Sequence, residues 1–276
     1  MIKTSYLMTK KLISGVLLAS LCLSAAAQSF IVADKYVKTK DYYDACADKC
    51  PDIDYRFIDS GTDWLDSIIN KAVVSDLKFG NDDKVTEQRW KTFDSQAKPS
   101  QAQLTNQLNY AIADFVKANK AWLDESQSAL KYSASSTPHY LGHKTLKNGI
   151  ELELFRVDGD QYLGGAHGVS WSTYYVFDMA KKRKLKLDDI VMPNQQPVLE
   201  KMVKAEYQNY LKQNELDPAE MAQTWRFFLT DNFSFTNQGV TFLYQHYDIT
   251  PYVMGMPEFT IPYSRLNGVI KPEYLP

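Results

Sequence analysis

The stretch ALKYSASSTPHYLGHKTLKNGIELELFRV, residues 129–157, decides the fold of this chain. Asn148-Gly149 lies inside it, and this dipeptide is the strongest short-range hairpin signal because both residues tolerate positive φ. On its C-terminal side, Ile150 to Val157 alternates apolar and polar residues with the period of a half-buried strand. The stretch therefore predicts two antiparallel strands joined at Asn148-Gly149.

Further strand patterns follow the hairpin. Asp158-Gly159-Asp160 is expected as a turn, because Asp-Gly favours turns and no acidic residue at the twelfth position completes a calcium loop. The remaining strands are predicted at Val169–Phe177, Phe233–Phe235, Val240–Tyr247 and Phe259–Tyr263, with turns at Met179–Arg183 and Asn237–Gly239 and a tail at Pro272–Pro276.

Helical periodicity is concentrated before the hairpin. Apolar residues recur at helical spacing from Trp64 to Leu77, and again after Pro99-Ser100 as far as Trp122. A third helix is predicted over Gln196–Gln213. Helices followed by hairpins predict an α+β fold, a mainly antiparallel sheet of hairpins packed against two or three helices. We expect an N-terminal helical part over 28–126 and an α+β domain over 127–276, with the seam at Gln127–Thr137.

The composition excludes some classes of function. The 276 residues include 31 Lys plus Arg and 33 Asp plus Glu, a formal charge of −2 that predicts no nucleic-acid partner. Hydrophobic residues make up 45% and charged residues 23%, which is typical of a globular protein.

The N-terminus has the pattern of a secretory signal. Lys10-Lys11 precede an apolar run from Leu12 to Ala27 that ends in Ala25-Ala26-Ala27, an A-x-A cleavage site. We expect a signal peptide over 1–27, with Met8 as a second possible start, and a mature charge of 28 − 33 = −5. A lipoprotein would instead be acylated at Cys22, but Leu21 stands where such signals have a small residue. No later segment is long and apolar enough for a membrane span, so the expected location is periplasmic or extracellular.

Cleavage would leave two cysteines, Cys46 and Cys50. In an oxidising compartment an even pair predicts a disulfide, and four-residue spacing allows one if the segment is helical or turned. A zinc site would need two further soft ligands.

No catalytic, metal or cofactor motif is complete. Gly168-Val169-Ser170-Trp171-Ser172 matches only half of a nucleophile elbow and leads into a strand. His139 and His143 have H-x3-H spacing, but in a strand they lie ~13 Å apart, too far for one ion. We therefore predict no metal, no cofactor and no catalysis.

The segment Gly164-Gly165-Ala166-His167-Gly168 is the most unusual one. Three glycines in five residues imply positive φ or close backbone approach. Its amides and His167 either line a ligand pocket or make a structural connection, and the second reading is favoured for a lone histidine.

Around this segment the sequence resembles a known family. Tyr162 to Gly168, Tyr174 to Asp178, Lys184 to Ile190, Tyr247 to Gly255 and Phe259 to Leu266 follow the order of the family called domain of unknown function 3298. The stretch from Cys50 to Lys71 is similar, more faintly, to the domain that usually precedes it.

The resemblance implies an exported α+β module of the bacterial cell envelope. The family forms the outer part of a lysozyme-sensing anti-sigma factor and accompanies some peptidoglycan deacetylases, so the implied ligand is a lysozyme-like protein or peptidoglycan. Candidate ligand-binding residues are Gly164, Gly165, His167, Tyr247 and Tyr252. The alternative is a secreted hydrolase of wall glycan or peptide, which a carboxylate pair or a Ser–His contact in the fold would favour.

Overall fold

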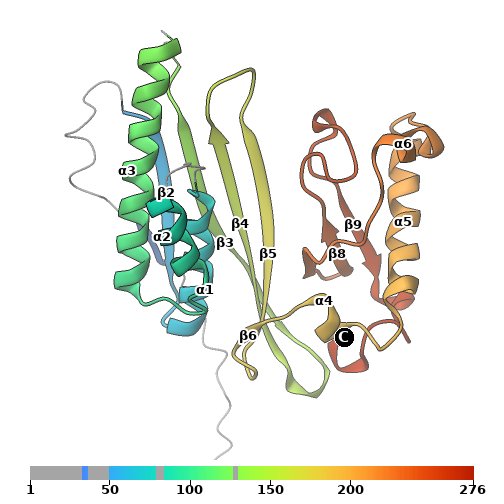
Figure 1. The fold of residues 1–276 in the computed structure, drawn as a ribbon. Coiled ribbons are helices and arrows are strands. Elements are labelled where there is room, and N and C mark those ends of the chain that lie inside the picture. Colours follow the sequence, from blue (N-terminus) through green and yellow to red (C-terminus); the bar gives the residue numbers. More distant parts are fainter. Residues whose placement is uncertain (1–32, 37–49, 79–83, 127–129) are drawn as a thin grey trace, which may run out of the picture. The chain divides into compact units, whose positions relative to one another are not determined.

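A computed structural model describes residues 33–36, 50–78, 84–126 and 130–276 (Figure 1). Its larger sheet has six strands in the order β1-β2-β3-β4-β5-β6, of which only β2 and β3 pair in parallel. The strands are β1 (Ala33–Tyr36), β2 (Asp52–Asp59), β3 (Ser133–Thr145), β4 (Glu151–Tyr162), β5 (Val169–Asp178) and β6 (Arg183–Lys184).

The predicted hairpin is confirmed as β3 and β4. Their connection, Lys147–Gly149, has φ of 65° at Asn148 and 72° at Gly149, the positive values that this dipeptide tolerates. The register shifts between Tyr140 and Gly142, which is a β-bulge. A bulge adds one residue to one strand, so the alternation of side chains between the two faces of β3 reverses there.

The prediction of a turn at Asp158-Gly159-Asp160 is wrong, because these residues lie inside β4. Gly159 is opposite Trp171 of β5, and a Cβ at Gly159 would stand 2.2 Å from the indole ring. The glycine therefore makes room for a cross-strand tryptophan, a role that short-range turn statistics do not detect.

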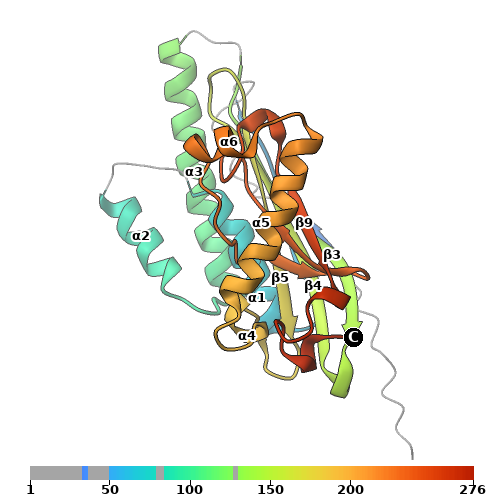
Figure 2. The ribbon, with the colours of Figure 1, turned by 90° about the vertical axis from the view of Figure 1, so that its right-hand side faces the viewer.

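Three helices lie on one side of the large sheet: α1 (Asp63–Asp76), α2 (Lys84–Asp94) and α3 (Gln101–Ser126). In Figures 1 and 2 they lie on the other side of β3–β5 from the second sheet. Of these helices, α2 packs on the other two, since Arg89 pairs with Asp114 of α3 and Phe93 lies against Lys71 of α1. Leu65, Ile69 and Val73 of α1 are fully buried, as helical spacing predicted. The sequence did not predict α2, because only Thr86, Trp90 and Phe93 of its eleven residues are buried.

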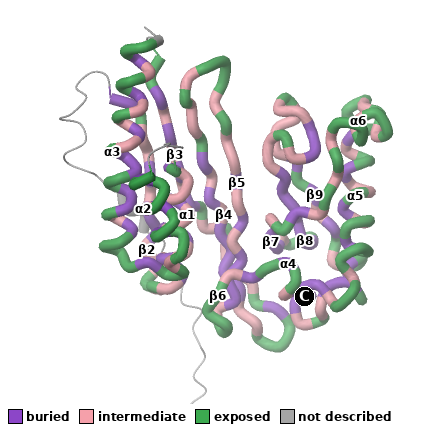
Figure 3. The backbone as a smooth tube through the Cα atoms, viewed as in Figure 1, coloured by how far each residue is buried: buried purple, intermediate pink, exposed green. Residues whose placement is uncertain are grey.

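The second sheet is antiparallel and has the order β7-β8-β9. Its strands are β7 (Phe233–Phe235), β8 (Gly239–Leu243) and β9 (Glu258–Pro262), and the chain between the sheets forms α4 (Leu187–Ile190), α5 (Gln196–Gln213) and α6 (Pro218–Thr224). Leu199, Val203 and Leu211 of α5 are buried in one core with β7–β9, coloured purple in Figure 3. The predicted tail is part of this core, since Tyr274 is only 1% exposed.

The predicted α+β class is confirmed, with hairpins forming most of both sheets. Residues 31–276 form one compact unit, and the parallel pairing of β2 with β3 crosses the seam predicted at 127–137. The signal peptide and Cys46 lie outside the described residues, so export and the disulfide stay predictions. Cys50 is buried. None of the described helices is both long and apolar enough to cross a membrane.

Candidate functional site

One face of β3, β4 and β5 carries a grid of polar side chains. The register places polar residues opposite one another on these strands, all on the face away from α1. The three rows are Ser135, Asp160 and Ser170; Thr137, Asp158 and Ser172; and His139, Arg156 and Tyr174.

The same face becomes apolar toward the other end of the strands. Leu152, Leu154 and Val176 are buried in the core formed with β7–β9 and α5. Only the apolar half is therefore packed as ordinary core against the second sheet. In the polar rows Ser172 and Tyr174 are buried, and the other seven residues are at least partly exposed. All of them except Tyr174 line a cavity between the sheets.

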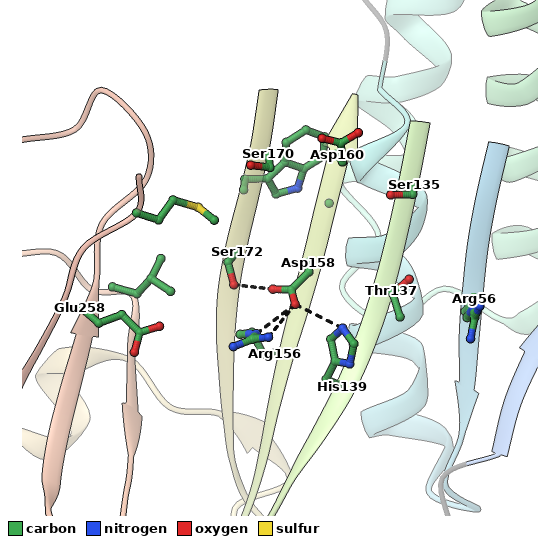
Figure 4. A pocket seen from close by; sticks show the side chains of 14 residues that line it. Arg56, Ser135, Thr137, His139, Arg156, Asp158, Asp160, Ser170, Ser172 and Glu258 are labelled. Atoms are coloured by element: carbon green, nitrogen blue, oxygen red, sulfur yellow. Dashed lines mark hydrogen bonds and ion pairs between the residues drawn. The ribbon is translucent and has the colours of Figure 1, made fainter. Parts of the chain in front are cut away.

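Asp158 is the centre of a hydrogen-bond network in this cavity (Figure 4). Its carboxylate accepts from Ser172 Oγ at 2.5 Å and from Nε and Nη2 of Arg156 at 3.1 and 2.8 Å. His139 Nε2 lies 3.2 Å from the same carboxylate. Three side chains from three strands are thus held in fixed positions by one acid.

A second contact joins the two sheets. Tyr174 of β5 donates from its hydroxyl to Glu258 of β9 at 3.0 Å. Burial raises the pKa of Tyr174 to about 12, with Glu258 adding to the effect and Arg156 opposing it. Tyr174 therefore stays neutral at physiological pH and keeps its proton for Glu258.

The cavity has a volume of about 600 Å³, within the range of small-molecule sites. The other lining residues are Leu243 of β8, Glu258 of β9 and Met256, which lies just before β9. We call this cavity the polar pocket. It has one wall of charged and hydroxyl groups and an opposite wall that is mainly apolar.

The edge of β5 beside the pocket is closed by side-chain amides. Gln245 Nε2 donates to the backbone oxygen of Ser172 at 2.6 Å, and its Oε1 accepts from Ser172 N at 3.0 Å. Asn232 bonds Ser172 O and Tyr174 N in the same way, at 2.9 and 2.8 Å. Three of the backbone groups that another strand would need at this edge, Ser172 N, Ser172 O and Tyr174 N, are therefore occupied.

An aromatic cluster lies next to the polar pocket. The Tyr252 ring stacks with His167 and with His246, at centroid distances of 4.4 and 4.3 Å. Tyr247 lies 5.6 Å from Tyr252 and stacks with Trp225 at 6.2 Å. The aromatic cluster is these five rings. It reaches the surface, since Tyr247 is 50% exposed.

Ser170 connects the two features. It lines the polar pocket, and its Oγ is 3.1 Å from His246 Nε2. This is the Ser–His contact that would favour a hydrolase. However, the buried Nδ1 of His246 has no hydrogen-bond partner among the described residues, so no acid orients the ring as in a catalytic triad.

The structure brings together three of the five predicted ligand-binding residues. His167, Tyr247 and Tyr252 all belong to the aromatic cluster, although they are distant in sequence. Gly164 and Gly165 have φ of 85° and 96°, and a Cβ at Gly164 would stand 2.7 Å from Trp122. The two glycines shape the loop that carries His167, whose Nδ1 lies 2.8 Å from Gly168 O.

Sequence reasoning missed the polar pocket. Its signal was present in β4, where the positions on one face change from Leu152 and Leu154 to Arg156, Asp158 and Asp160. The expected turn at Asp158-Gly159 interrupted that pattern.

The two strand histidines do not share a ligand. His139 pairs with Asp158, whereas His143, beyond the bulge, contacts Glu151 and lies 2.8 Å from Glu153. Within the described residues, no group of three His, Cys, Asp or Glu side chains is arranged to hold a metal.

Comparisons with known proteins agree with this fold. Residues 188–264 match the family described as "Protein of unknown function (DUF3298)". No curated protein matches the chain. A DUF3298 family protein from Pseudomonas aeruginosa PAO1 has 21% identity and a TM-score of 0.57, covering 89% of this chain and 94% of that one. A DUF3298 member from Bacteroides fragilis NCTC 9343 has 20% identity and a TM-score of 0.57, with 88% and 92% covered.

The family match confirms the resemblance over 188–264. The quoted segments at 162–168 and 174–178 lie before it. At these identities the two solved structures are similar to the chain in fold alone.

Proposed function

Because residues 188–264 belong to the DUF3298 family, whose function is unknown, we propose that this chain is an exported, non-catalytic binding module of the bacterial cell envelope. Its ligand is a lysozyme-like protein or peptidoglycan, and it has no cofactor. Export is supported by Lys10-Lys11, the apolar run and Ala25-Ala26-Ala27. The predicted mature charge of −5 suits a basic protein partner such as a lysozyme.

The observation that carries the proposal is the aromatic cluster next to the polar pocket. Tyr offers a large apolar area with a polar tip, so clustered surface tyrosines suit both sugar rings and protein hot spots. Val253, next to Tyr252, is 87% exposed and extends the apolar surface. The surface combines stacking rings with neighbouring hydrogen-bonding groups, as a recognition site requires.

Surface plasmon resonance tests the proposal. The protein lacking residues 1–27 is passed over a lysozyme and over immobilised soluble muropeptides, each at low and high salt. A lysozyme should bind with an on-rate that falls as salt rises past ~0.15 M, because the Debye length is then only ~8 Å. A glycan should bind with little salt dependence. Binding to neither would contradict the proposal.

A matched pair of variants locates the binding surface. Tyr247→Ala removes a half-exposed ring of the aromatic cluster, and Tyr110→Ala removes a ring of α3 that is 55% exposed. Tyr247→Ala should weaken binding about tenfold or more, as for an aromatic contact residue, and Tyr110→Ala should leave it unchanged. Equal effects of the two substitutions on binding would mean that the binding surface does not include the aromatic cluster.

The hydrolase remains a second candidate because of the Ser170–His246 contact. Incubation with purified peptidoglycan, followed by assay of released reducing ends and free amines, separates the two functions. A binding module releases neither. Release by the wild-type protein that Ser170→Ala abolishes would establish the hydrolase instead.

A further inference from the structure

We infer that the polar pocket binds a neutral sugar unit, so that a glycan chain enters the pocket with one ring and continues over the aromatic cluster. The inference deepens the peptidoglycan form of the proposed function and rests on it. Four features of the pocket support a saccharide: its charge, its two walls, its fixed network and its closed strand edge.

The charges of the pocket nearly cancel. Arg56, His139 and Arg156 line it together with Asp158, Asp160 and Glu258. A phosphate or nucleotide site would have an excess of cations, and a cation site would have an excess of carboxylates without arginine. A ligand without net charge that both donates and accepts hydrogen bonds fits this balance best, and the hydroxyl groups of a sugar do both.

The two walls differ in the way that the two sides of a sugar ring differ. A pyranose has hydroxyl groups at its edge and C–H groups on its faces. In the polar pocket, hydrogen-bonding groups of β3–β5 lie opposite Leu243 and Met256. A ring placed between the walls directs its edge toward the grid and a C–H face toward the apolar side chains.

The network around Asp158 fixes the groups that meet the ligand. Arg156, His139 and Ser172 are all held by this one carboxylate, so less side-chain entropy is lost on binding. Ser135, Thr137 and Asp160 make no side-chain hydrogen bond to another described residue. Two hydroxyls and one carboxylate are thus available to a ligand beside the fixed network.

The closed edge of β5 argues against a peptide. A bound peptide commonly adds a strand to a sheet and uses its free backbone groups. Here Gln245 and Asn232 occupy the N–H and C=O of Ser172 and the N–H of Tyr174. At these positions a ligand must therefore be bound by side chains, as sugars commonly are.

The position of the aromatic cluster indicates in which direction the glycan chain leaves the polar pocket. Ser170 lies in the row nearest to it, and its Oγ contacts His246, which stacks with Tyr252. A ring bound at Ser135, Asp160 and Ser170 is therefore beside this stack. His167 and His246 cover the two faces of Tyr252, so the next sugar along the chain would lie over the half-exposed ring of Tyr247, where C–H groups can pack on an aromatic face.

The test uses two ligands and matched variants of the protein lacking residues 1–27. Thr137→Val removes a hydroxyl group from the pocket, and Asp160→Asn replaces an acceptor oxygen and its charge with an amide donor; both keep the shape of the side chain. Thr173→Val changes a half-buried threonine of β5 that does not line the pocket, and Glu220→Gln changes an exposed acid of α6. Sedimentation with purified peptidoglycan sacculi and NMR titration with an oligomer of N-acetylglucosamine are measured for each, with a lysozyme as the protein ligand.

The expected result is that the wild-type protein binds sacculi and the oligomer. Thr137→Val and Asp160→Asn should weaken both about tenfold, as for a lost hydrogen bond to a ligand, whereas the two control variants should bind as the wild type does. Unchanged melting temperatures confirm that the variants fold.

Three other outcomes would overturn the inference, and each says something different about the proposed function. If the pocket variants bind sacculi as tightly as the wild type does, the protein is a peptidoglycan-binding module that uses another surface. If the protein binds a lysozyme but neither sacculi nor the oligomer, the ligand is a lysozyme-like protein and not peptidoglycan. Binding to none of the three ligands overturns the proposed function as well.

Discussion

The side-chain amide of Gln245 makes both backbone hydrogen bonds of Ser172, donating to its carbonyl at 2.6 Å and accepting from its N–H at 3.0 Å. An amide side chain thus replaces a neighbouring strand, and the two residues are 73 positions apart. This contact, with that of Asn232, attaches the chain of the second sheet to the edge of the first. The polar pocket lies beside this attachment.

Gln245→Ala should destabilise the protein by about 1–3 kcal/mol, because it leaves two partly buried backbone groups of Ser172 with fewer partners. Urea denaturation followed by tryptophan fluorescence measures the change. Gln223→Ala, in an exposed position of α6, is the control and should have no effect. A decrease in the free energy of unfolding that is smaller than the experimental error would mean that water replaces the hydrogen bonds of Gln245 at no cost.

Asp76 should make stability depend on pH. Burial raises the pKa of Asp76 from 3.8 to about 6, although Ser136 and Trp171 donate hydrogen bonds to the carboxylate. The folded state therefore holds this proton more tightly than the unfolded state does. Its contribution is most favourable below about pH 4 and is lost as pH rises through 6, on the order of 3 kcal/mol in total.

Asp76→Asn tests this assignment, since an amide cannot ionise and fits the same space. The free energy of unfolding of wild type minus that of Asp76→Asn, measured in urea from pH 4.5 to 7.5, should fall as pH rises. The same difference for Glu220→Gln, at an exposed position, should stay flat. A difference that rises with pH would show that Asp76 is stabilised as the anion.

Gly164 and Gly165 have similar positive φ but different surroundings. A Cβ at Gly164 meets the Trp122 ring at 2.7 Å, and a Cβ at Gly165 meets nothing within 4 Å. Gly165→Val should cost at least ~1 kcal/mol for backbone strain alone, and Gly164→Ala should cost more than Gly165→Ala because the ring must also move. Thermal denaturation compares the variants.

His167→Gln should be milder than the glycine variants, because the side chain is exposed. Its ring stacks with Tyr252, so the effect on ligand binding is informative. Binding lost at an unchanged melting temperature would give His167 a direct role in recognition and not only a structural one.

Cys46 and Cys50 should be oxidised in the exported protein. Thiol titration of denatured, unreduced protein should find no free thiol. The enclosed loop is short, so Cys46→Ser should cost only ~1–3 kcal/mol in urea denaturation. Two titratable thiols in material purified from the periplasm would contradict the pairing.

Export should remove residues 1–27. N-terminal sequencing of secreted or periplasmic protein should begin at Gln28, the residue after Ala25-Ala26-Ala27. Retention of residues 12–27, or acylation of Cys22, would contradict this cleavage.

The sequence by itself determined the elements whose information is local. Asn148-Gly149 determined the central hairpin because both residues adopt positive φ, and the spacing of Leu65, Ile69 and Val73 determined α1 because those residues share one helical face. Helix α2 was not predicted, because it has few buried residues and their helical spacing is a weak signal.

Only the tertiary structure decided the site. Asp158 gains two of its partners, His139 and Ser172, from the neighbouring strands. This depends on a strand register that continues through Gly159, where the Trp171 ring fills the space that a side chain would need. Tyr252 and His167 are 85 positions apart in the sequence and stack in the folded chain, where Gln245 attaches the chain of the second sheet to β5. A single sequence shows how apolar and polar residues are spaced along the chain. It does not show which distant strand supplies the second wall of the polar pocket. That choice is made by the packing of whole elements.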